Sequence, residues 1–265
     1  MTASDFAIQT TAALRAVAEQ PASDENLARA LRLLAKWRAQ LIGNTLAMQS
    51  GTQILSGPFA GMDYGAGASE GSRSARLLGC YEASLAPVIE EIVASAPALI
   101  LDIGCAEGYY AVGLARRLPQ SRIMARDANP AARDLCAAMA VLNGVADRVA
   151  VGGLVGRADF DVALDADTVV ICDIEGAETD LLDPAAAPGL RNARILVECH
   201  DGITPRTTAT LTARFAPSHH VRRIDRALDA TALPPWMEAL SDLDRLLALW
   251  EWRAGPTPWL WMTPK

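Results

Sequence analysis

Acidic side chains and a histidine stand at the ends of three apolar runs in the middle of the chain. Asp127 follows the run SRIMAR, Asp173 and Glu175 follow TVVIC, and Glu198 and His200 close ARILVECH. Carboxylates and an imidazole can take up protons, orient a cation or bind a hydroxyl group. Because the carboxyl ends of parallel strands meet at one edge of a sheet, we expect these groups to converge on one ligand site.

A glycine-containing turn precedes these acids. The stretch LDIGCAEGYY places Asp102, Gly104, Ala106 and Gly108 between an apolar run and a helix-like run. A dinucleotide-binding turn needs the pattern G-x-G-x-x-G, but here alanine occupies the second glycine position and Tyr109 the third. The pattern acid-x-Gly-x-small-x-Gly instead resembles the first motif of class I S-adenosylmethionine-dependent methyltransferases.

This resemblance implies how the turn and the next acid would bind S-adenosylmethionine. The small residues would let the backbone pass the methionine part, and Asp102 would favour its ammonium group directly or through water. Asp127 lies 23 residues after Gly104, at the end of the second strand. Its carboxylate can accept hydrogen bonds from both ribose hydroxyls. Asp127 also suits the start of the following helix as a cap, because Asp-x-x-Pro is a helix-start pattern.

Four segments together resemble the FkbM-type family of methyltransferases. They are DIGCAEGYY, DANP, DIEGAETDLL and ILVECHD, and they span about half the chain, from Leu78 to Asp201. Ala128 stands where many members have proline, and Glu107 where asparagine is common. The resemblance also implies a contact of Glu82 with the cofactor or the acceptor.

The site residues implied in this way fall into two groups. The expected cofactor-binding residues are Glu82, Asp102, Gly104, Ala106, Glu107, Gly108, Asp127, Ala128 and Asp173. The expected catalytic residues are His200, Asp173, Glu175 and Glu198.

Methyl transfer from a sulfonium is an in-line displacement, so alignment is the main task of the protein. His200 is the preferred base because its ordinary pKa of about 6.5 suits neutral pH. A hydrogen-bonded scaffold role for His200, and capping roles for Glu175 and Glu178, are the alternatives. The four catalytic candidates lack the tight spacing of a metal motif, so no metal is expected and Mg²⁺ is disfavoured.

Strands and helices alternate from residue 98 onward, which predicts how these residues are positioned. Continuous apolar runs fit strands that are buried on both faces, and their alternation with helices predicts a parallel sheet. The predicted fold is α/β: a Rossmann-like, seven-stranded, mostly parallel sheet with helices on both faces and an N-terminal helical extension. The seven runs cover residues 98–104, 121–127, 147–153, 168–176, 193–201, 219–225 and 258–264.

Two N-terminal helices are predicted, one ending before Pro21 and one capped by Ser23 or Asp24. The second carries an apolar stripe that we expect to pack on the rest of the protein. This stripe consists of Leu27, Leu31, Leu34, Trp37 and Leu41. Residues 1–75 are assigned to the extension and a mobile loop over 65–72, and residues 76–265 to the methyltransferase domain.

Further elements are predicted around this core. A strand-like segment is expected to begin at Thr52, and helices over about 80–95, 205–215 and 236–250. Five tryptophans gather in the C-terminal third, where packing in the core or in a homodimer is preferred to a carbohydrate platform. They are Trp236, Trp250, Trp252, Trp259 and Trp261.

Composition narrows the classes of partner. The net charge of −7 disfavours nucleic acid and anionic membranes. No secretory signal and no apolar run long enough to span a membrane are expected. The five scattered cysteines without a CxxC pair argue against zinc or disulfides and favour a cytoplasmic protein.

The sequence therefore predicts a methyltransferase acting on an oxygen atom of a small molecule, such as a sugar or a natural-product intermediate. The choice of oxygen rests on the family resemblance alone. An N-methyltransferase is the close alternative, because acidic groups suit a cationic acceptor. A non-catalytic methyltransferase-like subunit is another alternative, against which the intact Asp102, Asp127 and Asp173 argue.

Overall fold

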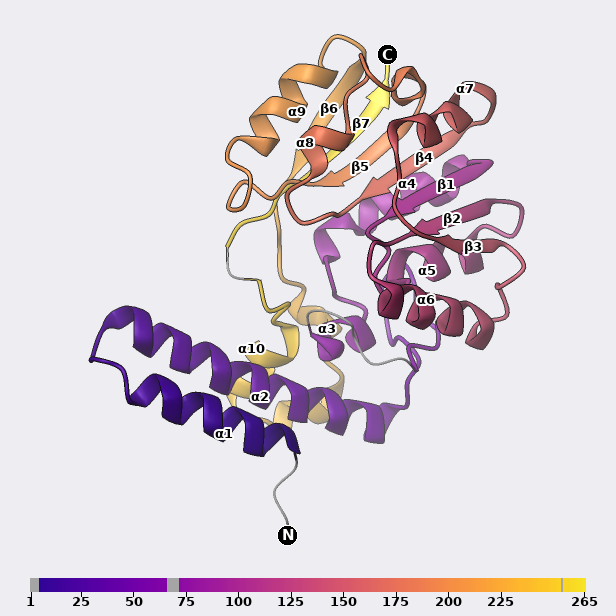
Figure 1. The fold of residues 1–265 in the computed structure, drawn as a ribbon. Helices are drawn as coiled ribbons and strands as arrows, with labels where there is room; N and C mark the ends of the chain where they lie inside the picture. Colours follow the sequence, from indigo (N-terminus) through magenta and orange to yellow (C-terminus); the bar gives the residue numbers. More distant parts are fainter. Residues whose placement is uncertain (1–4, 66–71, 254) are drawn as a thin grey trace.

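A seven-stranded sheet forms the centre of the protein (Figure 1). The computed structural model describes residues 5–65, 72–253 and 255–265. The strand order is β3-β2-β1-β4-β5-β7-β6. The first five strands of this order are parallel, and β7 runs antiparallel to both β5 and β6. The strands are β1 (Leu99–Ile103), β2 (Arg122–Arg126), β3 (Val149–Gly152), β4 (Thr168–Cys172), β5 (Arg194–Glu198), β6 (His219–Ile224) and β7 (Trp259–Pro264).

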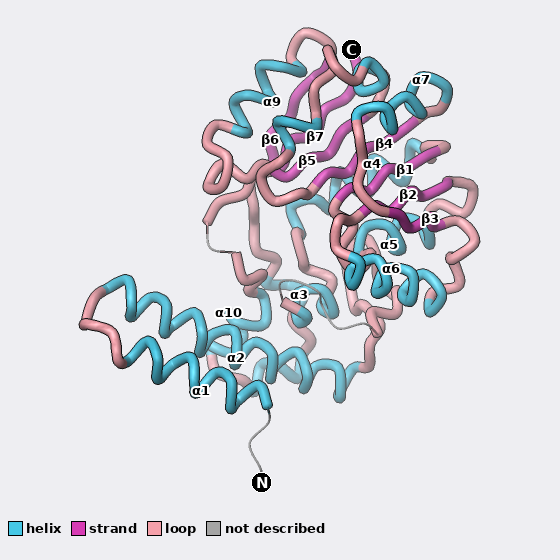
Figure 2. Tube along the Cα trace, viewed as in Figure 1, coloured by secondary structure: helices cyan, strands magenta, loops and turns pink. Residues whose placement is uncertain are grey.

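Helices cover both faces of the sheet, as Figure 2 shows, so the predicted fold class is confirmed. Ile100 belongs to a buried cluster that includes residues of α4 and α5. Its neighbour Leu101 belongs to a second buried cluster, on the other face, that includes Leu211 and Phe215 of α9. The α-helices are α1 (Asp5–Ala18), α2 (Asp24–Ser50), α3 (Arg73–Leu78), α4 (Ala86–Ser95), α5 (Tyr109–Arg117), α6 (Pro130–Leu142), α7 (Val162–Asp165), α8 (Glu178–Leu181), α9 (Thr207–Phe215) and α10 (Asp242–Leu249). Short 3₁₀ helices occupy Ala83–Leu85, Arg157–Asp161, Pro188–Arg191, Ala230–Ala232 and Pro235–Ala239.

The strand order reverses between β1 and β4, because β1 pairs with β2 on one side and with β4 on the other. In open parallel sheets, ligands bind beyond the carboxyl ends of the strands at such a reversal. Gly104 follows β1 and Asp173 follows β4, so the predicted turn and the predicted acid flank this point.

The N-terminal helices form a hairpin that extends away from the sheet (Figure 1). The predicted packing of the apolar stripe on α2 is wrong in its N-terminal half: Leu27 and Leu31 are each 67% exposed. Ala39, Ile42 and Leu46, nearer the C-terminal end of α2, are buried instead. α2 packs against α3 and α10 as well as against α1, and its contacts with the rest of the protein include Lys36 and Arg38 near its middle.

The connections differ from prediction at three places. The helix predicted over 80–95 begins as an α-helix only at Ala86, because Glu82 has a positive φ of 50°. The helix predicted over 236–250 is a 3₁₀ helix followed by α10. The strand-like segment from Thr52 makes a single bridge between Gln53 and Asp63.

The predicted domain boundary falls within a helix of the structure, and the predicted mobile loop lies mostly outside the described residues. The boundary between residues 75 and 76 falls inside α3, and the domain division stays a prediction. Most of the loop predicted to be mobile lies outside the described residues. Within the described residues, every helix is too short or too polar to cross a bilayer.

Candidate functional site

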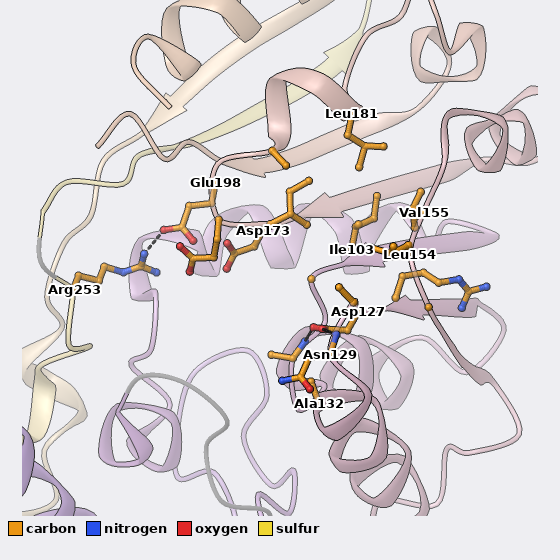
Figure 3. Close-up of a pocket in the computed structure, with 18 of the residues that line it drawn as sticks. Ile103, Asp127, Asn129, Ala132, Leu154, Val155, Asp173, Leu181, Glu198 and Arg253 are labelled. Carbon is orange, nitrogen blue, oxygen red and sulfur yellow. Dashed lines mark hydrogen bonds and ion pairs between the residues drawn. The ribbon is translucent and has the colours of Figure 1, made fainter. Parts of the chain in front are cut away.

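A cavity of about 770 Å³ opens at the carboxyl ends of β1, β2, β4 and β5 (Figure 3). This volume is within the range of pockets that enclose small ligands. We call one side of the cavity the β2 end; it includes Gly104, Ala106, Asp127, Leu154 and Val155. We call the opposite side the β5 end; it includes Asp173, Glu175, Glu198, Trp252 and Arg253.

The turn after β1 is built by close contacts within the chain. Gly104 has a φ of 82°, and a Cβ atom there would lie 1.6 Å from the carbonyl oxygen of Asp173. Gly108 has a φ of 95°, and its Cβ atom would lie 2.8 Å from the Sγ atom of Cys136. Glycine is therefore required at both positions because two chain segments meet there, a reason that the sequence pattern did not reveal.

Asp127 ties the turns after β1 and β2 together. Its Oδ2 atom accepts a 2.9 Å hydrogen bond from the backbone N–H of Ala106, and its Oδ1 atom accepts a 2.7 Å bond from that of Asn129. The alternative prediction that Asp127 caps α6 is wrong, because the Asn129 side chain caps that helix. Each carboxylate oxygen has a second lone pair, so Asp127 can still accept hydrogen bonds from a ligand.

Beside Asp127, the β2 end has an apolar wall. Leu154 is 82% exposed and lines the cavity together with Val155, Ile103 and Ala132 (Figure 3). Ala128, a predicted cofactor contact, also lines it. An exposed leucine next to a carboxylate with free lone pairs suits a ligand that has a flat apolar part and hydroxyl groups.

The β5 end is organised by Arg253, which comes from the segment after α10 (Figure 3). Its guanidinium contacts Glu198 and Glu82, and its Nε atom lies 3.0 Å from an oxygen of Glu251. Burial opposes the charge of Arg253, but the carboxylates of Glu82 and Glu198 raise the pKa of this guanidinium above its ordinary value. Arg253 therefore stays charged and holds three buried acids in place.

Asp173 and Glu175 face the cavity without such a partner. Among the described residues, neither carboxylate forms an ion pair with a lysine or arginine. Burial, and then the nearby charge of Glu198, raise the pKa of Asp173 well above its ordinary range. The β5 end therefore offers two carboxylates to whatever occupies the cavity.

His200 does not line the cavity. Its side chain is 5% exposed, and its Nδ1 atom lies 2.7 Å from the Oε1 atom of the fully buried Glu178. Its Nε2 atom points at Glu175 and Asp173, at 3.3 and 3.6 Å. Burial lowers the pKa of His200, but the hydrogen bond to Glu178 and the charge of Glu198 outweigh it, so the pKa is raised. The predicted base thus lies behind two carboxylates.

Four other predicted site residues also lie off the cavity wall. Glu82 is behind Arg253 and accepts a hydrogen bond from the Tyr110 hydroxyl; burial raises its pKa to about 7. Asp102 is 3% exposed, and burial raises its pKa to about 7 as well. Glu107, which is fully buried, pairs with Arg76 at 3.0 Å. Gly108 packs on α6 as described above. Direct contact with a ligand in the cavity is not available to these residues in this conformation.

Backbone strain gathers around the cavity. Six non-glycine residues have a positive φ within the described chain, and three of them line the cavity: Ala106, Glu175 and Trp252. Glu82 is a fourth, and it contacts Arg253. Such conformations cost about 1–3 kcal/mol each and persist where the surroundings hold them, most often at functional sites.

Several residues on the cavity wall were missed by the sequence analysis. Lys36 of α2 lies over the ring of Trp252 at 5.1 Å, and Arg76 of α3 lies over the ring of Tyr81 at 3.9 Å. Trp252 was assigned to packing, but it lines the cavity, whereas Trp259 and Trp261 are buried in β7. Lys36, Arg76 and Arg253 belong to no local sequence motif. The positive charge of each side chain was the only feature of the sequence that could have suggested a role in binding.

Comparison with known proteins finds solved structures whose backbone fold is similar at low sequence identity. No family model and no curated protein matches the chain. An O-methyltransferase from Bacillus cereus, solved with SAH, is 15% identical with a TM-score of 0.45, over 66% of this chain and 78% of that one. TomG, an O-methyltransferase from Streptomyces achromogenes involved in tomaymycin synthesis and solved with SAM, is 16% identical with a TM-score of 0.44, over 66% and 77%. Cofactor-bound Rv0187 from MTB is 15% identical with a TM-score of 0.44, over 98% and 90%.

Proposed function

We propose that the protein is an S-adenosylmethionine-dependent methyltransferase that acts on a small molecule. The observation that carries the proposal is the cavity at the reversal of strand order: at one end Asp127 keeps lone pairs for hydroxyl groups, and at the other Asp173 and Glu175 have no lysine or arginine partner among the described residues. Fold alone does not determine function, whereas the chemistry of these groups selects a ligand.

The β2 end fits the nucleoside of S-adenosylmethionine. Asp127 is held by two backbone N–H groups and keeps lone pairs for ribose hydroxyls. Leu154 and Val155 give an apolar wall for the adenine ring. When bound, the cofactor supplies an electrophilic methyl group on a positively charged sulfur, and Asp173 lies on the same cavity wall to favour that charge.

The residues of the β5 end would then align an acceptor and remove its proton. Alignment of this kind contributes about 7–11 kcal/mol to lowering a barrier. Asp173 replaces His200 as the proposed base, because its carboxylate lines the cavity and the His200 ring does not. His200 then acts as a positioning residue that is held by Glu178.

We propose that the methyl group is transferred to an oxygen atom and that the protein is of the FkbM type. Both proposals rest on the resemblance of four sequence segments to that family. Hydrogen-bond donors, carboxylates and the rings of Tyr81 and Trp252 on one wall also suit a polyhydroxylated acceptor. An amine or guanidine acceptor is the second candidate, because Asp173 and Glu175 lack a lysine or arginine partner among the described residues.

Calorimetry with S-adenosylmethionine, S-adenosylhomocysteine and NAD tests the cofactor. We expect the first two to bind with a stoichiometry of one and NAD to show no binding. Binding of NAD alone would overturn the proposal. A screen with methyl-labelled donor, in which matched hydroxyl and amine acceptors are compared, then decides between oxygen and nitrogen. A homodimer and a cytoplasmic location stay predictions; sedimentation of the purified chain tests the first.

A further inference from the structure

Asp173, Glu175 and His200 direct three potential metal-ligating atoms at one point on the β5 end. All three atoms lie within 4.8 Å of one another. The Nε2 atom of His200 is 3.3 Å from the Oε2 atom of Glu175 and 3.6 Å from the Oδ1 atom of Asp173. Divalent metals bind such ligands at about 2.0–2.2 Å, which separates neighbouring ligand atoms by about 3.0–3.6 Å for octahedral to tetrahedral angles. The two separations measured from Nε2 match that range.

The orientation of His200 points to a ligand on its Nε2 atom. Its Nδ1 atom is engaged by Glu178, which is itself fully buried and also accepts a 3.0 Å hydrogen bond from the backbone N–H of Gly176. The His200 side chain is 95% buried, and its Nε2 atom lies within ion-pair distance of Glu175 and Asp173 without a hydrogen bond to either among the described residues. Metal-binding histidines are usually held in this way, with the second ring nitrogen on a carboxylate.

The oxygen atoms around Nε2 are also incompletely satisfied. The Oδ1 atom of Asp173 is buried and has no hydrogen-bond partner. The nearby guanidinium of Arg253 is already shared among Glu82, Glu198 and Glu251, so it does not serve Asp173 or Glu175. A buried carboxylate oxygen without a partner is costly, and a cation at this point would remove that cost.

We propose that Asp173, Glu175 and His200 bind one divalent transition-metal ion, of the Mn²⁺ or Zn²⁺ kind. One imidazole and two carboxylates favour such a metal over Mg²⁺, which prefers oxygen ligands alone. Three protein ligands leave positions open for a substrate oxygen, as in catalytic sites. No metal is predicted from the sequence, because Asp173, Glu175, Glu198 and His200 lack the tight spacing of a metal-binding motif.

The role of the ion deepens the proposed function, on which it rests, whereas the binding itself does not depend on it. A hydroxyl group coordinated to the ion would lose its proton more easily. The O–H bond would break, the proton would pass to the free carboxylate oxygen of Asp173, the O–CH₃ bond would form, and the bond from methyl to sulfur would break with its electrons kept by sulfur. No oxidant or reductant is needed.

Titration of the chelator-treated full chain with MnCl₂ or ZnCl₂ alone tests the site, by calorimetry and, for Mn²⁺, by electron paramagnetic resonance. We expect one ion per chain, nitrogen coupling from one imidazole in the Mn²⁺ spectrum, and weaker binding of MgCl₂. Glu175→Gln and Asp173→Asn should each weaken binding at least tenfold, and Asp147→Asn, which removes a remote surface charge, should not. Glu175 is 61% exposed on its side chain, so its substitution leaves the core intact.

The proposal is overturned if neither Mn²⁺ nor Zn²⁺ binds with a stoichiometry of one, or if the two site variants bind as tightly as Asp147→Asn. Calorimetry with S-adenosylhomocysteine in the presence of chelator separates this result from the proposed function. Nucleoside binding without metal binding refutes the ion alone. Metal binding without nucleoside binding refutes the methyltransferase proposal and leaves the ion site standing.

Discussion

The two ends of the cavity are constructed in different ways. The β2 end is made by consecutive turns, in which Asp127 accepts hydrogen bonds from the backbone of Ala106 and Asn129. The β5 end is made by side chains from remote segments, in which Arg253 joins Glu82, Glu198 and Glu251. A backbone-built site suits a constant ligand, whereas a side-chain-built site can change its ligand with a few substitutions. This contrast agrees with the proposed placement of the cofactor at the β2 end and of the acceptor at the β5 end.

The largest expected effect on activity is that of substituting Asp173. This substitution tests whether the chemical step and cofactor binding depend on different residues. Asp173→Asn should lower kcat by about 10²- to 10⁴-fold, because the group that takes the acceptor proton is lost. The dissociation constant for S-adenosylhomocysteine, measured by calorimetry, should change little. Asp147→Asn is the control with the same change of charge. A parallel loss of nucleoside affinity would assign Asp173 to the cofactor and weaken the contrast.

Removal of Arg253 tests whether the β5 end depends on buried ion pairs. Arg253→Met should lower the free energy of unfolding by about 3–5 kcal/mol, because buried carboxylates lose their cation. Adding Glu82→Gln should recover part of this loss. Denaturant unfolding measures both, with Arg245→Met as the control, since its exposed pair with Glu238 contributes less than about 1 kcal/mol. Equal losses for the two arginines would show that the acids around Arg253 need no cation.

The smallest effect is expected at the β2 end. Asp127→Ala should weaken binding of S-adenosylhomocysteine by about 10- to 100-fold, as expected for the loss of charge-assisted hydrogen bonds of about 1.5–3 kcal/mol in total. Asp127→Asn keeps one acceptor oxygen, so its affinity for S-adenosylhomocysteine should lie between those of Asp127→Ala and the natural protein. Calorimetry gives both constants. Unchanged affinity in Asp127→Ala would mean that the nucleoside does not sit beside this carboxylate.

The β2 end could be predicted from sequence because its parts are close along the chain. Gly104, Ala106 and Asp127 belong to one strand–helix–strand unit, and each lines the cavity as expected. The burial of Asp102 and Glu107 could not be predicted in the same way, because the pattern identifies the turn but not which of its side chains face inward; their predicted cofactor contacts stay predictions. Their burial is decided by packing of the turn against α3 and α5, which the pattern does not contain.

Prediction also failed where a helix was assumed to need its whole apolar stripe buried. Leu27 and Leu31 have helical spacing, but they lie on the half of α2 that extends beyond the sheet. Periodicity shows which residues share a face of a helix. It does not show how far along that helix the rest of the protein reaches.

The sequence by itself determined the α/β class, the seven strands and the turn after β1, because hydrophobic periodicity and glycine conformation act over a few residues. Only the tertiary structure decided that Lys36, Trp252 and Arg253 share a cavity with the strand ends. It also decided that His200 stands behind Asp173 and Glu175. Such contacts depend on strand order and on where distant helices pack, and burial then fixes which charges are paired and which remain free for a ligand.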